Sequence, residues 1–295
     1  MHVSTKFETQ KVIKKDMSYS VHSPKPRTLS FSFRMLSLCS PGLASKLAAR
    51  LIFTPHRRRI KGREYDLWLR ATPFLVEFND QQLIGMSWGF GPTILLVHGW
   101  GGNFTQLSDF IKPLIRTGYK VVAFDAPAHG FCHKTQTNAV EFADAINRIA
   151  DEIEPVKAVI GYSLGAASTI IALDNGLKVE RAVILASPYS MHTVIDIFSN
   201  SLNLTKKASI RLKERIEKKI GRDLNQISPS SIVPRLTIPS LIIHDSNDTL
   251  IPYDQGVLLA KTWSGAQVYT TSGLGHKGLL HDKNLIKKVV RFINY

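Results

Sequence analysis

Short, continuous apolar runs that alternate with amphipathic segments of helical length constrain the fold of this chain more than any other feature. The runs lie at 93–97, 120–124, 158–162, 182–186 and 241–243, with a weaker one at 268–271. The amphipathic segments lie at 104–115, 138–153, 164–174 and 279–293. Continuous apolar runs are typical of strands that are buried on both faces of a parallel sheet. The alternation therefore predicts an α/β fold, with a doubly wound, mostly parallel sheet flanked by helices.

Two regions depart from this alternation. Residues 74–78 and 82–88 have the pattern of two strands joined by a tight turn. The stretch between Ser187 and Pro239 has no strand pattern, and two helices are expected within it. Because this stretch follows one strand of the sheet and precedes the next, it is expected to cover the rim of the sheet.

The N-terminal region carries most of the positive charge. The formal net charge of the chain is +15, and residues 1–70 hold 15 Lys or Arg but only 4 Asp or Glu. Residues 1–39 show no clear periodicity and are predicted to form a flexible basic leader. Ser40-Pro41 is typical of a helix start, and leucines recur at every fourth position after it. A short amphipathic helix and a basic connector are therefore expected over 40–69. The apolar face of the helix is expected to dock on the domain, with a membrane as the alternative.

These patterns divide the chain into four parts. The flexible leader at 1–39 precedes the helix and connector at 40–69. The α/β core is expected to consist of residues 70–187 and 239–295, because single α/β domains of about 200–250 residues are common. A helical cap at 188–238 is inserted between the two halves of this core.

Composition limits the classes of partner and the compartment. No apolar run approaches the ~18 residues that a membrane-spanning helix needs. The run Arg57-Arg58-Arg59 lacks the further basic and aromatic partners of a nucleic-acid patch, so no nucleic acid is expected. Cys39 and Cys132 fit no metal motif and favour a reducing compartment, so a cytoplasmic protein is predicted. Contact of the basic N-terminus with an anionic membrane and transit to an organelle are the alternatives.

A Gly-x-Ser-x-Gly pentapeptide marks the candidate nucleophile. Gly161, Ser163 and Gly165 follow an apolar strand and precede an Ala-rich helix. This is the context of a nucleophile elbow, in which a tight turn exposes the serine at a helix N-terminus. Such a turn strains the serine backbone and crowds the residues two before and two after it, so glycines are expected there.

A serine nucleophile needs a base, and the base needs an orienting group. In a doubly wound sheet the reacting groups gather beyond the carboxyl ends of the strands, which selects His98, His244 and His276. His276 lies in a Gly-rich loop after the last strand and is the preferred base, whereas His98 is interpreted as a structural hydrogen-bonder. Asp248 is the preferred acid and Asp245 is the runner-up. The chain order Ser, Asp, His is the one expected after an elbow serine.

The negative charge of an acyl-transfer transition state requires hydrogen-bond donors. One is expected to be the backbone N–H of Leu164, directly after the serine. The other is expected from the Gly-rich loop 98–102, and the N–H of Trp100 is the preferred donor. This loop lacks the Lys-Ser/Thr pair of a phosphate-binding P-loop. No metal or organic cofactor is needed for this chemistry.

Five segments of the chain resemble the α/β-hydrolase superfamily in their order and approximate spacing. They read LLVHGWGG, FDAPAHG, GYSLG, HDSNDTLIP and GLGHKG, and the resemblance extends over about residues 70–295. It implies the α/β-hydrolase fold with a helical cap at 188–238. It also implies a catalytic triad and two oxyanion donors, which would be Ser163, Asp248, His276, Trp100 and Leu164.

Two positions depart from the superfamily pattern. The turn at 125–130 is similar to an Asp-x-x-Gly-His-Gly turn, but Ala128 replaces the usual glycine. Cys132 stands where the superfamily often has serine. Both departures concern a structural turn near the site and leave the triad intact.

A serine at the elbow implies acyl transfer through an acyl-enzyme. The sequence therefore predicts a carboxylesterase-like serine hydrolase that cleaves an ester or thioester of a small or medium acyl substrate. One alternative is an enzyme like a lipase or lysophospholipase that acts at membranes. The other is a non-catalytic ligand-binding protein on a hydrolase scaffold. The patterns do not assign an oligomeric state.

Overall fold

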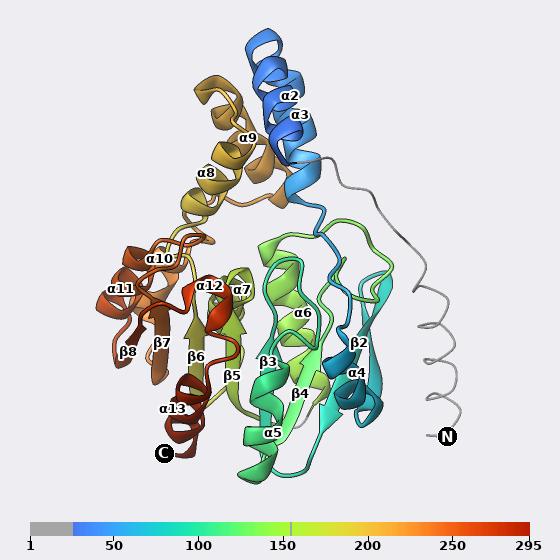
Figure 1. The fold of residues 1–295 in the computed structure, drawn as a ribbon, viewed down its shortest axis with the longest axis vertical. Coiled ribbons are helices and arrows are strands. Elements are labelled where there is room, and N and C mark those ends of the chain that lie inside the picture. Colours follow the sequence, from blue (N-terminus) through green and yellow to red (C-terminus); the bar gives the residue numbers. More distant parts are fainter. Residues whose placement is uncertain (1–25, 154) are drawn as a thin grey trace.

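A computed structural model describes residues 26–153 and 155–295 as one eight-stranded sheet flanked by helices (Figure 1). The strands are β1 (Thr72–Phe78), β2 (Gln81–Trp88), β3 (Thr93–Val97), β4 (Lys120–Phe124), β5 (Val156–Tyr162), β6 (Arg181–Leu185), β7 (Ser240–Asp245) and β8 (Ala266–Thr271). Their order across the sheet is β1-β2-β4-β3-β5-β6-β7-β8. β2 pairs antiparallel with β1 and with β4, and the other neighbours pair parallel. The predicted doubly wound, mostly parallel α/β sheet is confirmed.

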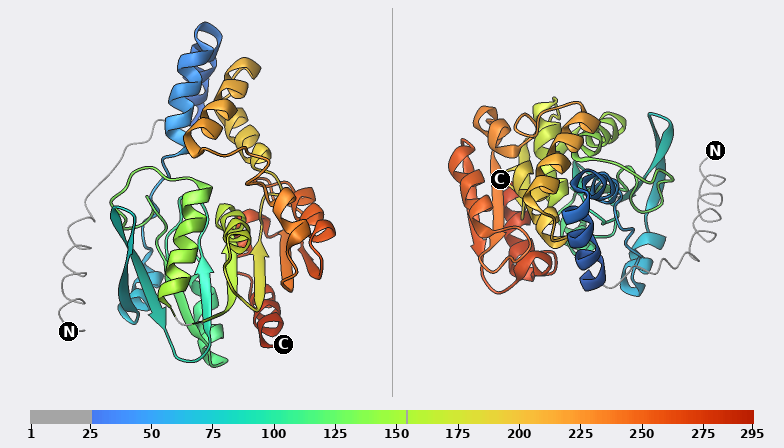
Figure 2. Two further views of the ribbon diagram at one scale, coloured as in Figure 1. Left: turned by 180° about the vertical axis from the view of Figure 1, so that it is seen from behind. Right: turned by 90° about the horizontal axis from the view of Figure 1, so that it is seen from above.

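Helices cover both faces of the sheet (Figures 1 and 2). The helices of the described residues are α2 (Pro26–Cys39), α3 (Pro41–Ile52), α4 (Gly62–Leu69), α5 (Ser108–Arg116), α6 (Ala139–Glu152), α7 (Leu164–Asp174), α8 (Met191–Ser201), α9 (Lys206–Ile220), α10 (Pro229–Ile232), α11 (Tyr253–Thr262), α12 (Gly275–Gly278) and α13 (Lys283–Asn294). Leu95 and Val97 of β3 join the core under α6, α7 and α11, whereas Ile94 and Leu96 join the core under α4, α5 and α13. Because alternate residues of β3 enter opposite cores, the strand is apolar from Ile94 to Val97.

Helix α11 has no counterpart among the segments expected from the sequence. Its inward-facing residues include Gln255 and Gly256, whereas Val257 and Leu258 are exposed. A polar residue and a glycine on the buried side, with apolar residues outside, hide the amphipathic period that predicts a helix. Contact with β7 and β8 stabilises the helix instead.

Helix α2 corrects the prediction of a flexible leader over 1–39. Phe33 of this helix is buried in the core, whereas Phe31 and Met35 are exposed. Apolar side chains therefore lie on both sides of this helix, and no single inward stripe marks it. Residues 1–25, the remainder of the expected leader, lie outside the described part of the chain.

Four helices stand together beyond one edge of the sheet, and we call α2, α3, α8 and α9 the tower (Figures 1 and 2). Helices α8 and α9 come from the insertion at 188–238, in which the structure has helices and no strand. α3 packs along α9, and α2 packs on α3. The N–H of Thr205 donates to Ser37 Oγ at 3.1 Å, and Arg215 Nε donates to Ser45 Oγ at 2.9 Å. Two segments far apart in sequence thus form one body.

The basic connector after α3 is attached to the core. Arg58 forms an ion pair with Glu64 of α4 and donates to Asn103 Oδ1 at 3.1 Å. Arg57 Nη2 donates to the carbonyl oxygen of Cys132 at 2.6 Å. These two arginines therefore fix the path of the chain from the tower to the sheet, which is a structural role.

Candidate active site

Ser163 lies at a sharp turn between β5 and α7. Its backbone has φ 56° and ψ −126°, in the positive-φ region that residues other than glycine rarely adopt. Its N–H donates to the carbonyl oxygen of Leu185 in β6 at 2.8 Å, which anchors the turn to the sheet. The serine side chain is partly exposed, so a substrate can reach its hydroxyl.

Two glycines provide the space for this turn. A Cβ at Gly165 would lie 1.9 Å from the carbonyl oxygen of His98, and a Cβ at Gly161 would lie 2.8 Å from the Cα of Ala166. The nearest atoms to each glycine therefore belong to other residues, and the expected crowding between the two glycines is not what requires them. The glycines instead allow α7 to approach the end of β3 and the backbone of β5 closely.

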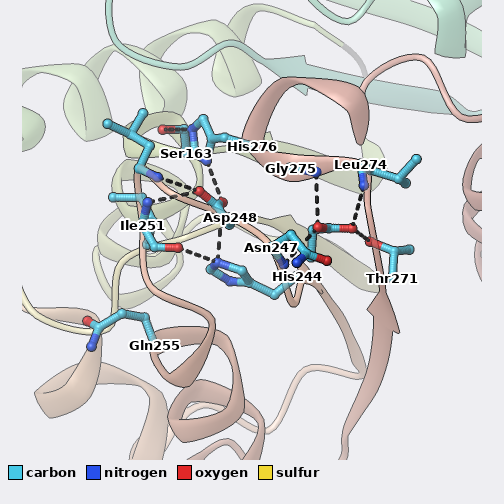
Figure 3. A network of polar contacts seen from close by, with 12 residues as sticks. Ser163, His244, Asn247, Asp248, Ile251, Gln255, Thr271, Leu274, Gly275 and His276 are labelled. Carbon is cyan, nitrogen blue, oxygen red and sulfur yellow. Dashed lines mark hydrogen bonds and ion pairs between the residues drawn. The ribbon is translucent and has the colours of Figure 1, made fainter.

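Figure 3 shows Ser163, His276 and Asp248 in one chain of hydrogen bonds. His276 Nε2 lies 3.0 Å from Ser163 Oγ, and His276 Nδ1 lies 2.7 Å from Asp248 Oδ2. Asp248 is 8% exposed and His276 is 9% exposed, so little water competes for these contacts. The three residues selected from the sequence come from β5–α7, from the loop after β7 and from α12. All of these segments lie beyond the carboxyl ends of parallel strands.

Asp248 uses both oxygens of its carboxylate. Oδ1 accepts the N–H groups of Leu250 and Ile251 at 2.9 and 3.0 Å, while Oδ2 faces His276 and His244. Burial alone would raise the pKa of this carboxyl, but hydrogen bonds from His244 and His276 outweigh burial and hold the pKa well below its ordinary value. Asp248 therefore stays ionised and can keep a proton on the histidine nitrogen that faces it.

His244 is a second histidine on the carboxylate of Asp248, a contact that sequence reasoning missed. Its Nε2 lies 2.9 Å from the carbonyl oxygen of Ile251 and 3.4 Å from Asp248 Oδ2. Both neighbours are acceptors, so Nε2 carries the proton. On the other side of the ring, a Cβ at Gly256 would lie 2.6 Å from Nδ1, so α11 covers it. His244 thus orients the carboxylate of Asp248. Its position only four residues before Asp248 was the one feature of the sequence that could have indicated this contact.

Asp245, the runner-up for the acid, holds the loop that carries His276. Its carboxylate accepts the N–H groups of Leu274 and Gly275 at 3.1 and 2.9 Å, and the hydroxyl of Thr271 at 2.7 Å. Burial raises the pKa of Asp245, but these hydrogen bonds outweigh it and lower the pKa overall. Besides the N–H of Asn247, its donors lie from Thr271 at the end of β8 to Gly275 at the start of α12, so Asp245 positions the imidazole without touching it.

Two other histidines near the strand ends have partners of their own. His281 Nδ1 lies 2.7 Å from Asp109 Oδ2 on α5, and His281 is largely exposed. His98 Nδ1 lies 2.8 Å from the carbonyl oxygen of Gly99, and Nε2 accepts the N–H of Ala126 at 3.1 Å. Burial lowers the pKa of His98 well below its ordinary value, so it is a neutral link between two loops. In residues 26–153 and 155–295, no three His, Cys, Asp or Glu side chains gather as metal ligands.

The backbone segments expected to supply oxyanion donors border Ser163 on two sides. Leu164 is the first residue of α7 and follows the serine directly. A Cβ at Gly99 would lie 3.1 Å from Ser163 Cβ, so the backbone just before Trp100 runs against the serine. Gln106 Oε1 accepts the N–H of Gly99 at 2.8 Å and fixes this loop. Gln106 is a further residue that sequence reasoning missed, because its role depends on the folded loop.

Asp125 ties the turn after β4 to the loop after β3. Its carboxylate accepts the N–H of Phe104 at 2.8 Å and the N–H of Phe131 at 2.9 Å. A Cβ at Gly130 would lie 1.9 Å from Asp125 Oδ2, so only glycine fits there. Ala128 has φ 64°, the left-handed conformation for which the resembled superfamily uses glycine. An alanine in this conformation adds strain to the turn.

A buried pair of histidines at this turn makes the fold sensitive to acid. The rings of His98 and His129 are 4.9 Å apart, and burial lowers the pKa of His129 from 6.5 to about 4. Because the folded pKa is depressed, the unfolded chain takes up a proton first as the pH falls. The contribution of neutral His129 to the free energy of unfolding is therefore fully present above about pH 6.5, and it is lost as the pH falls towards 4. Between pH 7 and pH 5, His129 alone is expected to lower the free energy of unfolding by about 2 kcal/mol.

Urea denaturation of the wild-type protein and of His129→Gln at pH 7 and pH 5 measures this effect. The variant is expected to lose about 2 kcal/mol less between the two pH values, whatever its stability at pH 7. Equal losses in the two proteins would show that His129 is protonated equally in both states, contrary to this expectation.

Comparison with known families identifies part of the chain. Residues 94–212 match the sequence profile of the Alpha/beta hydrolase family. The matched segment contains Ser163 and ends before Asp248 and His276.

Two curated relatives are similar to different lengths of the chain. A pimeloyl-[acyl-carrier protein] methyl ester esterase of Vibrio campbellii is 32% identical over 103 residues, which cover 34% of this chain and 39% of that enzyme. This chain thus matches less than half of the length of that relative. A pyrrolizixenacetamide deacetylase of Xenorhabdus hominickii is 24% identical over 250 residues, which cover 71% of this chain and 92% of that enzyme.

Solved structures share the fold at low sequence identity. An esterase from Exiguobacterium antarcticum superposes with a TM-score of 0.60 at 15% identity, covering 75% of this chain and 99% of that one. A thioesterase domain from the curacin biosynthetic pathway gives a TM-score of 0.58 at 18% identity, covering 76% of this chain and 99% of that one. At this identity the likeness concerns the fold alone.

Proposed function

The chain belongs to the α/β-hydrolase superfamily, and from this membership we propose that it is a serine hydrolase that cleaves esters or thioesters. In this proposal Ser163 is the nucleophile, His276 is the base and Asp248 is the acid. The observation that carries it is the unbroken chain of contacts from Asp248 Oδ2 through the imidazole of His276 to Ser163 Oγ, at 2.7 and 3.0 Å. A hydroxyl with this partner can be deprotonated as it attacks.

The reaction follows from this geometry in two halves. Ser163 Oγ bonds to the acyl carbon while its proton moves to His276 Nε2, and the carbonyl oxygen becomes an oxyanion. The N–H groups of Leu164 and Trp100 are proposed to donate to that oxygen. The bond to the leaving group then breaks, and the leaving group takes the proton from His276. In the second half, water repeats these steps on the acyl-enzyme and releases the acid.

The ionised carboxylate of Asp248 supports an enzyme over a non-catalytic binding protein. Burying an ionised carboxylate costs free energy unless hydrogen bonds compensate for it, and here they come from two backbone N–H groups and two histidines. One of these histidines, His276, also contacts the partly exposed hydroxyl of Ser163. A binding site on the same scaffold would need neither this carboxylate nor this imidazole.

The proposed substrate is an ester or thioester with a small or medium acyl group. Two relatives support this proposal, because a methyl ester esterase and a deacetylase, both similar to this chain, are named for cleavage at an acyl carbon. The acyl group and the leaving group are to be identified by measurement.

A fluorophosphonate probe and a panel of nitrophenyl esters test this proposal. The probe is expected to label the wild-type protein covalently and to leave Ser163→Ala unlabelled. The ester panel, with acyl chains from acetyl upwards, is expected to show turnover for the wild-type protein that Ser163→Ala lacks. Absence of labelling and turnover in the folded wild-type protein would favour the non-catalytic alternative instead.

A further inference from the structure

The helical hairpin formed by α2 and α3 presents large apolar side chains to solvent. Their exposed fractions are substantial: Phe31 64%, Met35 42%, Leu38 55%, Leu43 47%, Leu47 41% and Leu51 40%. On each helix these residues recur every three or four positions, so each set forms one stripe along its helix. Large exposed apolar surfaces of this kind mark sites of interaction.

The buried side of the hairpin, by contrast, consists largely of small side chains. Ala44, Ser45 and Ala48 of α3 are 0% exposed and lie in the helix that packs along α9. Ser37 of α2 is 1% exposed and accepts a hydrogen bond from the N-cap of α9. An ordinary surface helix turns its large apolar residues inward. In this hairpin Phe33 is buried beside these small residues, but Leu38, Leu43, Leu47 and Leu51 remain exposed.

The helices that carry the apolar stripes, and the neighbouring α9, are rich in positive charge. Residues 26–52 contain four Lys or Arg and no Asp or Glu, and residues 206–220 contain seven Lys or Arg and two Glu. A cavity of about 980 Å³ between α3 and α9 is lined by five of these cations, Lys46, Arg50, Arg215, Lys218 and Lys219, and by no carboxylate. Leu47, part of the apolar stripe of α3, also lines this cavity. The apolar and cationic surfaces are therefore continuous.

The tower stands on the same side of the sheet as the candidate active site. Figure 1 shows the tower beyond the edge at which α12, the helix of His276, is found. The junction of α2 and α3, at Cys39 and Ser40, lies at the far end of the tower (Figures 1 and 2). A surface that contacts this end therefore faces the edge of the sheet that carries Ser163.

We propose that α2, α3 and α9 form a docking surface for an anionic phospholipid bilayer. The apolar stripes enter the boundary between headgroups and acyl chains, and the cations between α3 and α9 hold lipid phosphates. In the described ranges, no helix is long and apolar enough to cross a membrane. The proposal does not depend on the chemistry of Ser163. Together with that chemistry, it implies substrates that partition into lipid.

Charge distinguishes a bilayer from a second copy of this chain as the occupant. A symmetric contact between two towers would bring the cations of 26–52 and 206–220 against their own copies. Like charges at such an interface repel each other and oppose association. An anionic bilayer, in contrast, offers apolar chains to the stripes and phosphates to the cations at once.

Vesicle co-sedimentation of the full chain tests the proposal. Wild-type protein is expected to bind phosphatidylcholine vesicles with about 30% phosphatidylserine at least about tenfold more tightly than pure phosphatidylcholine vesicles. Raising the salt from about 0.05 M to about 0.5 M is expected to weaken this binding severalfold. Ser163→Ala is expected to bind as the wild-type protein does, which keeps this test separate from that of the catalytic proposal.

Matched variants locate the surface. Leu38→Gln/Leu47→Gln is expected to weaken vesicle binding about tenfold. Leu69→Gln/Leu75→Gln, which changes two exposed leucines outside the tower, is expected to leave it unchanged. The folding of each variant is checked by its urea midpoint.

A second matched pair tests the charges. Lys46→Gln/Arg50→Gln is expected to reduce the preference for anionic vesicles. Lys283→Gln/Lys287→Gln, in the cavity beside α5 and α13, is expected to preserve it.

A thiol-reactive fluorophore provides a direct readout. Cys39 is exposed at the end of the tower, whereas Cys132 is buried and burial raises the pKa of its thiol to about 12, so Cys39 is the reactive site. A polarity-sensitive dye on Cys39 is expected to shift to the blue when anionic vesicles are added.

Several outcomes would overturn the proposal. They are a dye that does not respond, vesicle binding that survives Leu38→Gln/Leu47→Gln but disappears when residues 1–25 are removed, and a dimer that these two substitutions dissolve.

Discussion

Replacing His276 with alanine is expected to lower kcat for an activated ester by about 10⁴- to 10⁶-fold, with KM changed by less than about threefold. The imidazole lies 3.0 Å from Ser163 Oγ and accepts its proton only as the bond to the acyl carbon forms. Its loss therefore removes stabilisation of the transition state and spares the binding of the ground state. Steady-state kinetics with the nitrophenyl ester that the wild-type protein turns over fastest provide the measurement.

Two sets of variants serve as comparisons for His276→Ala. Because the residues act as a unit, Ser163→Ala and the double variant Ser163→Ala/His276→Ala are expected to retain about the same residual rate as His276→Ala. His281→Ala is the matched control, since His281 follows closely in sequence but pairs with Asp109 on α5. A collapse of kcat in His281→Ala, with normal turnover in His276→Ala, would show that His281 and not His276 is the base.

The substitution Asp248→Asn is expected to lower kcat by about 10⁴-fold, because an amide cannot hold His276 in the required tautomer. The NH₂ group of an asparagine can donate to Nδ1, which would leave the ring proton on Nε2. Nε2 could then no longer accept the proton of the Ser163 hydroxyl. The pKa of Asp248 lies well below its ordinary value, so the wild-type carboxylate is ionised throughout the range in which such an enzyme works.

Asp245→Asn separates orientation of the imidazole from support of its loop. The carboxylate of Asp245 binds Thr271, Leu274 and Gly275, and an amide oxygen cannot serve all of these donors. We expect a loss in kcat of about 10- to 100-fold together with a lower melting temperature. Kinetics and thermal unfolding of the two variants side by side make the distinction. A larger loss of kcat in Asp245→Asn than in Asp248→Asn would reverse the two roles.

The central part of the fold follows from local patterns in the sequence. Residues 94–97 are apolar at every position because alternate side chains of β3 enter two different cores. Such a run predicts a buried parallel strand without knowledge of its neighbours. Helices α2 and α11 were missed because their apolar residues do not form one inward stripe, and their positions depend on contacts made only in the folded chain.

The candidate site shows the same division between local and tertiary information. Ser163 is marked by its glycines and by the strand before it, and His276 and Asp248 by their places after strands, so sequence reasoning could select all three. The second histidine on Asp248 was missed, because the hydrogen bonds of His244 depend on how the loop after β7 folds back over the strand. The reason for the glycines was also predicted incorrectly, since the atom that excludes a side chain at position 165 belongs to His98.

The shared packing of α2, α3, α8 and α9 limits how this region can open. The chain leaves α3 for the sheet through residues 53–61, enters α8 from β6, and returns from α9 to β7 through residues 221–239. Three chain connections therefore join the tower to the sheet. A body held in this way can tilt, but it cannot swing about a single pivot. Any displacement of this body must therefore move together helices that lie far apart in the sequence.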